Sequence, residues 1–362
     1  MRYLFIIQGE GRGHLTQAMT LEKLLLSRGH QVVKMLVGKS ESRTLPAFFT
    51  NGVKAPIAYF ETINFVTASS DKRPDALKTV LFNVAFSPKL VPSISMIKNE
   101  IRNCSPDIIV NFYELLGTVT HELRARDIPM VCIGHQFLFL HEDFSFPEFS
   151  GYEGHIALNL FSKAICNGAA KTLALSFRPM ADDSKKRIIV TPPLLRPEVL
   201  DSRNTPDYQD GDYILGYMLN AGFAEEVIAW HKKRPEIPLH FFWDNASEGP
   251  VKQIDPTLSF YYLNDKEFIK QMAGCRAYAS TAGFESICEA MYLGKPLMMV
   301  PSHIEQKCNA YDATRFGAAV ESDRFDLDIL LDFAENHFRR DDGFPEWAQA
   351  AGEIVAKELE TL

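Results

Sequence analysis

Short runs of apolar and β-branched residues alternate along the chain with longer segments in which apolar residues recur at helical spacing. This alternation is typical of parallel sheets flanked by crossover helices. In the first half the predicted strands are Tyr3–Ile7, Gln31–Val37, Ile108–Phe112, Met130–Ile133, Thr172–Leu175 and Arg187–Val190. In the second half they are Asp212–Leu219, His240–Trp243, Leu258–Leu263, Ala277–Ser280 and Leu297–Val300. The pattern therefore predicts an α/β protein built from two βαβ series.

A stiff, proline-rich stretch separates the two series. Thr191–Pro197 contains three prolines and is followed by the polar segment Asp201–Asp212, a composition typical of an interdomain linker. The length of 362 residues exceeds the usual size of a single core. We therefore expect a first domain over residues 1–200 and a second domain that begins at residue 201.

Composition excludes several classes of protein. The net charge of -8, without a compensating basic stripe, argues against a nucleic-acid partner. No apolar run approaches the length of a transmembrane helix, and the run after Arg2 is too short for a signal peptide. The six cysteines lie singly, and Cys132 and Cys288, which fall inside apolar elements, indicate buried thiols in a reducing cytoplasm. A cytoplasmic protein is the expectation.

The most informative segment, Ser280–Gln306, joins a glycine turn, a short helix, a strand and a polar loop. Gly283 lets the backbone turn tightly and approach a ligand without a Cβ in the way. A helix over Ser286–Leu293 then begins near Gly283 and ends at a glycine C-cap, Gly294. The free N–H groups and the positive dipole at such a helix start suit a diphosphate.

Polar side chains further along the same segment extend the candidate site. Glu289 lies one turn into the helix, where its carboxylate could accept hydrogen bonds from the paired hydroxyls of a ribose. After the strand Leu297–Val300, the chain enters a loop that carries His303, Glu305 and Gln306. Loops at the carboxyl ends of parallel strands are where α/β proteins bind ligands.

This segment resembles the donor-binding signature of the GT-B glycosyltransferases, in both the plant-type UDP-glycosyltransferases of family 1 and the lipid-II N-acetylglucosaminyltransferases of family 28. The resemblance covers about twenty-five positions. It implies two Rossmann-like, doubly wound parallel-sheet domains that face a cleft. It also implies a donor-binding domain over residues 201–344 and a final helix, 345–362, packed back on the first domain. The alternative is a plain α/β crossover with a glycine turn.

The resemblance assigns roles to individual residues of the donor site. The residues implied are Gly283, Phe284 and Ser286 around the diphosphate, Glu289 at the ribose, and Glu305 and Gln306 at the sugar hydroxyls. Thr281 stands where the plant signature has a histidine near the phosphates. Its hydroxyl can still donate a hydrogen bond to a phosphate, although it brings no imidazole.

The amino terminus supplies a second signal, the glycine-rich turn Gln8–His14 between a strand and a helix. Its Gly-x-Gly-x-Gly spacing departs from the dinucleotide-binding fingerprint, so the turn alone is weak evidence. In the families that the chain resembles, a glycine loop followed by histidine faces the cleft. The resemblance makes Gly13 a donor contact and His14 a general base or a phosphate contact. The alternative is a histidine beside a helix N-cap.

The chain departs from the family pattern at the carboxylate that would pair with His14. In plant-type members an aspartate at the end of a later strand orients the histidine, but Phe112 stands at the corresponding position. Glu114, two residues on, is the nearest carboxylate that could replace the aspartate or contact the acceptor. It could equally be a helix-start carboxylate near the positive end of the dipole.

Two further loops of the second half could contact the donor. Asn220 opens Asn220–Gly222, which precedes a predicted helix over Phe223–Lys232 and could offer an amide to phosphate. By the resemblance, the backbone around Leu263 would read the base, just before a helix that Asp265 would cap. Both segments also fit ordinary strand-to-helix loops.

The acceptor side is less defined. His135 and Gln136 follow the strand that ends at Ile133 and are the candidate acceptor contacts, unless they only satisfy loop backbone. The apolar segments Leu77–Ile101 and Phe137–Phe161 suggest interior helices or, alternatively, a surface for a lipid-linked acceptor at a membrane.

The sequence thus predicts an inverting glycosyltransferase that moves a sugar from a nucleotide diphosphate, expected to be UDP, to a hydroxyl of a lipid-linked or glycan acceptor. Peripheral contact with the inner membrane surface would accompany a lipid-linked acceptor. No histidine cluster suggests a metal, so none is expected, and no resident cofactor is expected. Two alternatives remain: a nucleotide-sugar epimerase using Glu10, Glu114 and Glu285, and a non-catalytic nucleotide-sugar-binding protein.

Overall fold

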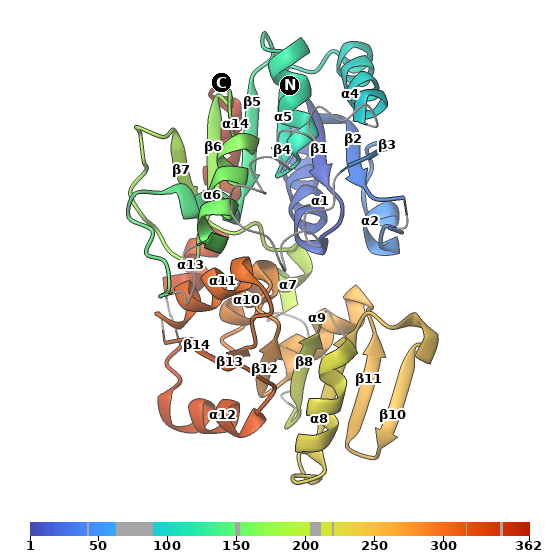
Figure 1. The fold of residues 1–362 in the computed structure, drawn as a ribbon, viewed down its shortest axis with the longest axis vertical. Coiled ribbons are helices and arrows are strands. Elements are labelled where there is room, and N and C mark those ends of the chain that lie inside the picture. The colour runs from blue at the N-terminus through green and yellow to red at the C-terminus, as the bar shows by residue number, and fades with distance from the viewer. Residues whose placement is uncertain are drawn as a thin grey trace. The chain divides into compact units, whose positions relative to one another are not determined.

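A computed structural model describes residues 1–41, 43–62, 90–148, 153–202, 211–218, 221–315, 317–340 and 343–362. The chain divides into two compact units, which Figure 1 shows with their elements labelled. Unit 1 comprises Met1–Leu194 and Ala350–Leu362, and unit 2 comprises Leu195–Gln349. Among the described residues, no helix combines the length and the apolar character needed to cross a bilayer.

Unit 1 contains a seven-stranded sheet with the order β3-β2-β1-β4-β5-β6-β7, in which every neighbouring pair is parallel. The strands are β1 (Arg2–Gln8), β2 (Gln31–Lys39), β3 (Ile57–Glu61), β4 (Ile108–Phe112), β5 (Met130–Gly134), β6 (Lys171–Leu175) and β7 (Ile188–Thr191). The central strands are nearly all apolar because helices cover both of their faces.

Crossover handedness explains how the helices of unit 1 are arranged. The chain passes from β1 to β2 in one direction and from β4 to β5 in the other, so right-handed crossovers place their helices on opposite faces. The helix α1 contacts α2 and α14, whereas α5 contacts α4 and α6. These helices are α1 (Arg12–Ser27), α2 (Ala47–Gly52), α4 (Val91–Cys104), α5 (Leu115–Arg124), α6 (Glu153–Ile165) and α14 (Ala351–Glu360), with a 3-10 helix η2 (His135–Leu140) after β5.

The carboxyl-terminal residues differ from the single helix expected over 345–362. They form α13 (Gly343–Gln349) and α14, and the boundary between the two units falls between these helices. Within unit 1, α14 packs on α1 and β7. Arg28 and His30 both donate to the carboxylate of Glu360, and Lys171 donates to Glu358.

Unit 2 contains a second seven-stranded sheet, ordered β10-β11-β9-β8-β12-β13-β14, in which only β10 and β11 pair antiparallel. The strands are β8 (Ile214–Met218), β9 (Leu239–Trp243), β10 (Val251–Asp255), β11 (Leu258–Tyr262), β12 (Ala277–Ser280), β13 (Leu297–Met299) and β14 (Ala319–Glu321). The sequence pattern missed β10 and β14, and β3 of unit 1. The two sheets confirm the predicted α/β class.

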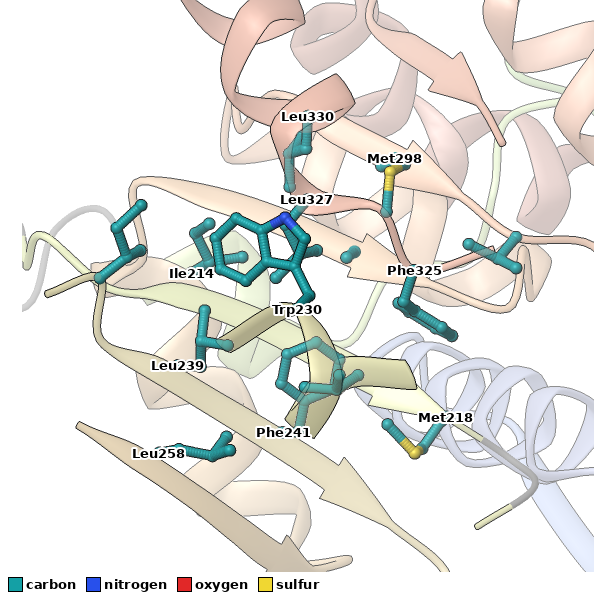
Figure 2. Close-up of a cluster of buried hydrophobic side chains, with 14 of the residues drawn as sticks. Ile214, Met218, Trp230, Leu239, Phe241, Leu258, Met298, Phe325, Leu327 and Leu330 are labelled. Atoms are coloured by element: carbon teal, nitrogen blue, oxygen red, sulfur yellow. The ribbon is translucent and has the colours of Figure 1, made fainter. Parts of the chain in front are cut away.

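A cluster of apolar side chains fills one face of the second sheet (Figure 2). Trp230 of α8, Phe241 of β9 and Leu330 of α12 all contribute to it. The helices of unit 2 are α7 (Pro197–Ser202), α8 (Ala224–His231), α9 (Asp265–Gly274), α10 (Phe284–Tyr292), α11 (Ile304–Thr314), α12 (Leu327–Asp332) and α13, with short turns η3 (Ala221–Phe223), η4 (Ala246–Glu248) and η5 (Phe333–His337).

The structure describes only part of the two apolar segments that were considered for a lipid-linked acceptor. Of Leu77–Ile101, residues 77–89 lie outside the described residues, and the remainder belongs mainly to α4. Phe137–Phe161 includes part of η2 and most of α6, with residues 149–152 outside the described residues. Ile97 and Ile101 of α4 are buried, as expected of an interior face.

Candidate active site

Each sheet has one point at which the strand order reverses, and some of the predicted site residues follow the strands at these points. In unit 1 the reversal lies between β1 and β4, and in unit 2 between β8 and β12. Ligands of open α/β sheets bind outside the carboxyl ends of the strands at such points. His14 and Glu114 follow β1 and β4, and the turn Thr281–Gly283 follows β12.

The glycine-rich turn after β1 is shaped by close backbone contacts. The N–H of Gly9 donates to the carbonyl oxygen of Gly38 at 2.7 Å, and a Cβ on Gly9 would lie 2.7 Å from that oxygen. Gly9 is therefore required sterically. The side-chain oxygen of Gln8 accepts hydrogen bonds from the N–H groups of Glu10 and Gly11. Gly13 is the second residue of α1, so it lies within the helix start.

His14 is buried in the first turn of α1. Its Nδ1 lies 3.4 Å from Oε1 of Gln17, and its ring stacks on Tyr113 with centroids 5.5 Å apart. Burial lowers the pKa of His14 to about 4, an effect that the hydrogen bond with Gln17 only partly opposes. The imidazole is therefore neutral at pH 7 and can accept a proton.

The strand-end position at which the resemblance implied an aspartate is apolar here. Phe112 is fully buried, and its ring packs edge-on against Phe5 with centroids 5.2 Å apart. Within the described ranges, no carboxylate is hydrogen-bonded to His14. Gln17 and the ring of Tyr113 orient this imidazole instead.

Glu114 is the N-cap of α5, as the helix-start alternative predicted. Its Oε1 accepts hydrogen bonds from the N–H of Leu116 at 3.1 Å and from Oγ1 of Thr62 at 2.8 Å. The other oxygen packs so closely on Gly38 that a Cβ there would lie 2.5 Å away. Burial raises the pKa of Glu114 to about 7, and the negative charge of Glu10 adds to this effect. The carboxyl group is thus half protonated near neutral pH.

His135 and Gln136 begin η2 directly after β5, and both are buried. Nδ1 of His135 lies 2.7 Å from the carbonyl oxygen of Leu175 at the end of β6. The ring of His135 also contacts Phe139 and Phe177. This imidazole is therefore anchored to the neighbouring strand, while its role toward an acceptor stays a prediction.

In unit 2 the turn after β12 differs in one respect from the expectation. Ala282, not Gly283, adopts the left-handed backbone conformation, with φ of 58°. Gly283 has φ of -72° and serves as the N-cap of α10. The sequence argument assigned the turn to the glycine because glycine adopts positive φ most easily. Gly283 is partly exposed, and a Cβ there would meet Oγ of Ser286 at an ordinary contact distance of 3.8 Å.

The predicted phosphate contacts all belong to this turn and the first turn of α10. Thr281 and Phe284 are buried, and Ser286 is partly exposed. Oγ of Ser286 donates to the carbonyl oxygen of Gly283 at 3.1 Å, which closes the first turn of the helix. The helix ends before Gly294, which has φ of 66° as expected of a glycine C-cap.

Glu289 is held by a cation that the sequence argument did not identify. Nε and Nη2 of Arg196 donate to its two carboxylate oxygens at 2.6 and 2.7 Å. Nη1 of Arg196 lies 3.5 Å from a carboxylate oxygen of Asp265. Only 2% of Glu289 and 9% of Arg196 is exposed. The carboxylate proposed for the ribose is therefore fixed in one orientation.

Glu305 and Gln306 lie in the first turn of α11 and not in the expected loop. No helix was predicted here, but α11 begins at Ile304, directly after its extended N-cap His303. Oε1 of Gln306 accepts hydrogen bonds from both the N–H and the hydroxyl of Ser302, at 2.9 and 2.8 Å. The side chain of Gln306 thus turns back toward the end of β13.

The remaining donor candidates have mixed outcomes. Asn220 lies outside the described residues. Leu263 lies half-buried between β11 and α9, where its backbone is the predicted contact to the base. The N-cap of α9 is Asn264, whose side chain accepts from the N–H of Glu267, and not Asp265 as expected. Asp265 is instead the first helical residue, next to Arg196.

Three residues near the predicted site were missed from the sequence: Arg196, Asn309 and Tyr113. Arg196 lay in a stretch interpreted as linker. Asn309 looked like an ordinary polar position of a helix, although its side chain donates to the carbonyl oxygen of Ala282 at 3.0 Å. Tyr113 has φ of 59°, an uncommon value for a tyrosine that no sequence pattern reveals.

A family model described as "Glycosyl transferase family 1" matches residues 1–337 of the chain. No curated protein matches it by sequence. The match spans residues of both units and includes all the predicted site residues.

Solved glycosyltransferase structures share the whole fold at low sequence identity. UGT2 of Phytolacca americana, solved with UDP-2-fluoroglucose and pterostilbene, is 16% identical with a TM-score of 0.63, covering 98% of this chain and 94% of that one. The spinosyn rhamnosyltransferase SpnG is 12% identical with a TM-score of 0.65, covering 99% and 100%. MurG of Acinetobacter baumannii is 15% identical with a TM-score of 0.58, covering 100% of both chains. These likenesses confirm the predicted GT-B fold class.

Proposed function

This glycosyltransferase belongs to glycosyl transferase family 1, and we propose that it transfers a sugar from a UDP-linked donor to a hydroxyl acceptor with inversion at the anomeric carbon. The observation that carries the proposal is the turn Thr281–Gly283. It lies at the point of strand reversal in unit 2, directly before α10, and its Gly283 is partly exposed. The free N–H groups and the positive dipole at a helix start, together with nearby hydroxyl groups, can bind a diphosphate.

The donor would contact unit 2 through residues that differ in chemistry. N–H groups of the Gly283 turn and the hydroxyls of Thr281 and Ser286 would bind the diphosphate. Glu289 would accept hydrogen bonds from the ribose, because a carboxylate offers about four acceptor sites and Arg196 occupies two. The amide group of Gln306 and the carboxylate of Glu305 would bind the sugar hydroxyls. The nucleotide sugar is a co-substrate in this proposal, and no resident cofactor takes part.

His14 would be the base that accepts the acceptor's proton. Its Nδ1 faces Gln17, so the proton would go to Nε2. As the O–H bond of the acceptor breaks, its oxygen forms a bond to the anomeric carbon from the face opposite the leaving group. The bond between that carbon and the β-phosphate oxygen breaks, and UDP leaves with the electron pair. Donors at the helix start stabilise the charge that develops on the diphosphate.

Equilibrium binding and product analysis test the proposal. A thermal-shift screen should show stabilisation by UDP above that by ADP, GDP or dTDP, because a ligand that binds only the folded state raises its stability. Incubation with a UDP-sugar of defined anomeric configuration and a panel of hydroxyl acceptors should then give a glycoside of opposite configuration, read by NMR.

Other outcomes would identify other functions. Preference for dTDP would keep the transferase and replace the proposed nucleotide. A product with retained configuration would reject direct displacement. Isomerisation of the UDP-sugar without an acceptor would indicate an epimerase instead. Failure of every nucleoside diphosphate to bind would reject the donor site itself.

A further inference from the structure

We propose that Asn309 is a positioning residue: it holds the left-handed turn at Ala282 so that the N–H of Gly283 points toward the donor's diphosphate. This inference rests on the proposed function, because it deepens the donor site of unit 2. Asn309 lies on α11, twenty-seven positions after Ala282, and both residues are fully buried.

Ala282 adopts a backbone conformation that its side chain disfavours. Its φ is 58°, and a Cβ makes the left-handed region unfavourable for every residue except glycine. Such residues persist only where the surroundings hold them, and they cluster at functional sites. The strained residue therefore requires specific contacts that compensate for its conformation.

Two side chains hold the two peptide groups of Ala282. The N–H of Ala282 donates to Oγ of Ser280 at 3.2 Å, a contact within the same turn. The carbonyl oxygen accepts from Nδ2 of Asn309 at 3.0 Å, a contact that comes from a different helix. The second bond is the one that ties the turn to the rest of unit 2.

The bond from Asn309 also sets the direction of the next N–H group. The peptide bond between Ala282 and Gly283 is trans, so its C=O and N–H point in opposite directions. Because the carbonyl oxygen points to Asn309, the N–H of Gly283 points away from α11. Gly283 is itself partly exposed, and a Cβ there would meet no atom closer than Oγ of Ser286 at 3.8 Å. The geometry thus presents one backbone donor to a ligand at the start of α10.

Asn309 also shares its helix with a predicted sugar contact. Gln306 lies three positions earlier on α11, and residues at this spacing lie on the same helix face. Gln306 bonds to Ser302 at the end of β13, while Asn309 bonds to the turn after β12. One face of α11 therefore connects the loops that follow two adjacent strands.

The first test is a stability cycle that needs no ligand. Asn309→Leu removes the hydrogen bond at similar volume, and Ala282→Gly removes the strain of the turn, because glycine accepts positive φ. We expect Ala282→Gly to stabilise the wild type more than it stabilises the Asn309→Leu variant, because a turn that Asn309 no longer holds can relax and carries less strain for glycine to remove. Ala290→Gly, in the middle of α10, is the matched control and should show no such coupling. Additive effects in both pairs would overturn the proposed role.

The second test is titration with UDP by calorimetry. Loss of a hydrogen bond of ordinary strength predicts about tenfold weaker binding by Asn309→Leu. The double variant Ala282→Gly/Asn309→Leu should recover most of this loss, whereas Ala290→Gly/Asn309→Leu should not. Binding by folded Asn309→Leu equal to that of the wild type would overturn the inference.

A third variant covers the case in which Asn309→Leu fails to fold. Ala282→Val keeps Asn309 but places a β-branched residue where φ is positive, and it should lose UDP binding. Unchanged binding by Ala282→Val would also overturn the inference. If the wild type binds no nucleoside diphosphate while the stability cycle shows coupling, the donor proposal fails and the structural role of Asn309 stands.

Discussion

Arg196 donates hydrogen bonds to both carboxylate oxygens of Glu289, with N–O distances of 2.6 and 2.7 Å. The two residues lie ninety-three positions apart in the chain. Charge-assisted pairs of this bidentate form are the strongest hydrogen bonds between side chains. The pair neutralises a carboxylate on the helix whose start is proposed to bind a diphosphate. Arg196 therefore removes a repulsion and leaves Glu289 able to accept from hydroxyl groups.

We predict that Arg196→Met lowers the free energy of unfolding of unit 2 by about 3–5 kcal/mol, the range for removing one partner of a buried pair. The cause is the uncompensated charge left on Glu289. Urea unfolding followed by tryptophan fluorescence measures unit 2 alone, because Trp230, Trp243 and Trp347 all belong to it. The double variant Arg196→Met/Glu289→Met should recover much of the loss.

Arg234 provides the matched control for this prediction. It also forms ion pairs, with Glu236 and Asp328, but all three side chains are largely exposed. Arg234→Met should leave the unfolding midpoint almost unchanged, since solvent screens exposed pairs. Equal losses from the two arginine variants would mean that burial does not set the strength of the Arg196 pair.

Much of this fold could be predicted from the sequence, because buried parallel strands are continuous apolar runs. Ile108–Phe112 is such a run, and its predicted bounds are those of β4. The strands that were missed lie at sheet edges. All five residues of β10 are polar or exposed, and β14 has three residues, so neither carries a clear pattern. An edge strand is paired with a neighbour on one side only and is more exposed, so its apolar pattern in the sequence is weaker.

In the candidate site, too, features set by neighbouring residues could be predicted from the sequence, whereas contacts between distant segments could not. Glycine turns and helix starts are local, so Gly283 and His14 could be named from the sequence. The pairs Arg196–Glu289 and Asn309–Ala282 join distant segments, and single-sequence patterns contain no distances. The tight turn was assigned to Gly283 because glycine has no Cβ to oppose it. Tertiary contacts place the strain on Ala282 instead.

The pH dependence of activity should distinguish His14 from Glu114 as the base. Only the deprotonated form of either group can accept a proton. If His14 is the base, kcat/KM falls as the pH drops through about 4, the lowered pKa of its buried imidazole. If Glu114 is the base, kcat/KM falls as the pH drops through about 7. We expect initial rates to fall only near pH 4, because His14 lies in the first turn of α1, next to the glycine-rich turn after β1.

Variants give the control for this profile. His14→Gln keeps a polar side chain but offers no base, so it should reduce kcat by about 100-fold or more with less effect on KM. Glu114→Gln should keep most of the activity and the acid limb of the wild type. An acid limb near pH 7 that disappears in Glu114→Gln would transfer the role of base to Glu114.

Glu114 should also make unit 1 less stable as the pH rises. Its pKa is raised in the folded state to about 7 from an ordinary value of 4.5, so the folded state binds more protons than the unfolded state between these values. Stability from this group is complete below about pH 4.5 and is lost as the pH rises through 7. Glu114→Gln keeps an oxygen that can accept from Thr62 and Leu116 but does not titrate.

We therefore predict that the stability of Glu114→Gln relative to the wild type increases between pH 4.5 and pH 8, by an amount on the order of 3 kcal/mol. Scanning calorimetry at several pH values measures it, because the tryptophans do not report on unit 1. A difference that stays constant with pH would show that Glu114 is ionised in the folded protein throughout this range.

A side chain at Gly216 on β8 should lower the stability of unit 2. A Cβ built there would lie 2.1 Å from Cε1 of Phe241, whose ring is fully buried in the cluster of Figure 2. Gly216→Ala should destabilise unit 2 by about 1–3 kcal/mol, because a packed ring can move only by displacing its neighbours. Gly352→Ala on α14 is the opposite case, since its Cβ would rest 3.4 Å from Cδ1 of Leu24. That substitution should stabilise unit 1 by up to about 1 kcal/mol through helix propensity. Tryptophan fluorescence and calorimetry would measure the two effects. Equal stability of Gly216→Ala and the wild type would mean that the ring of Phe241 can relocate without cost.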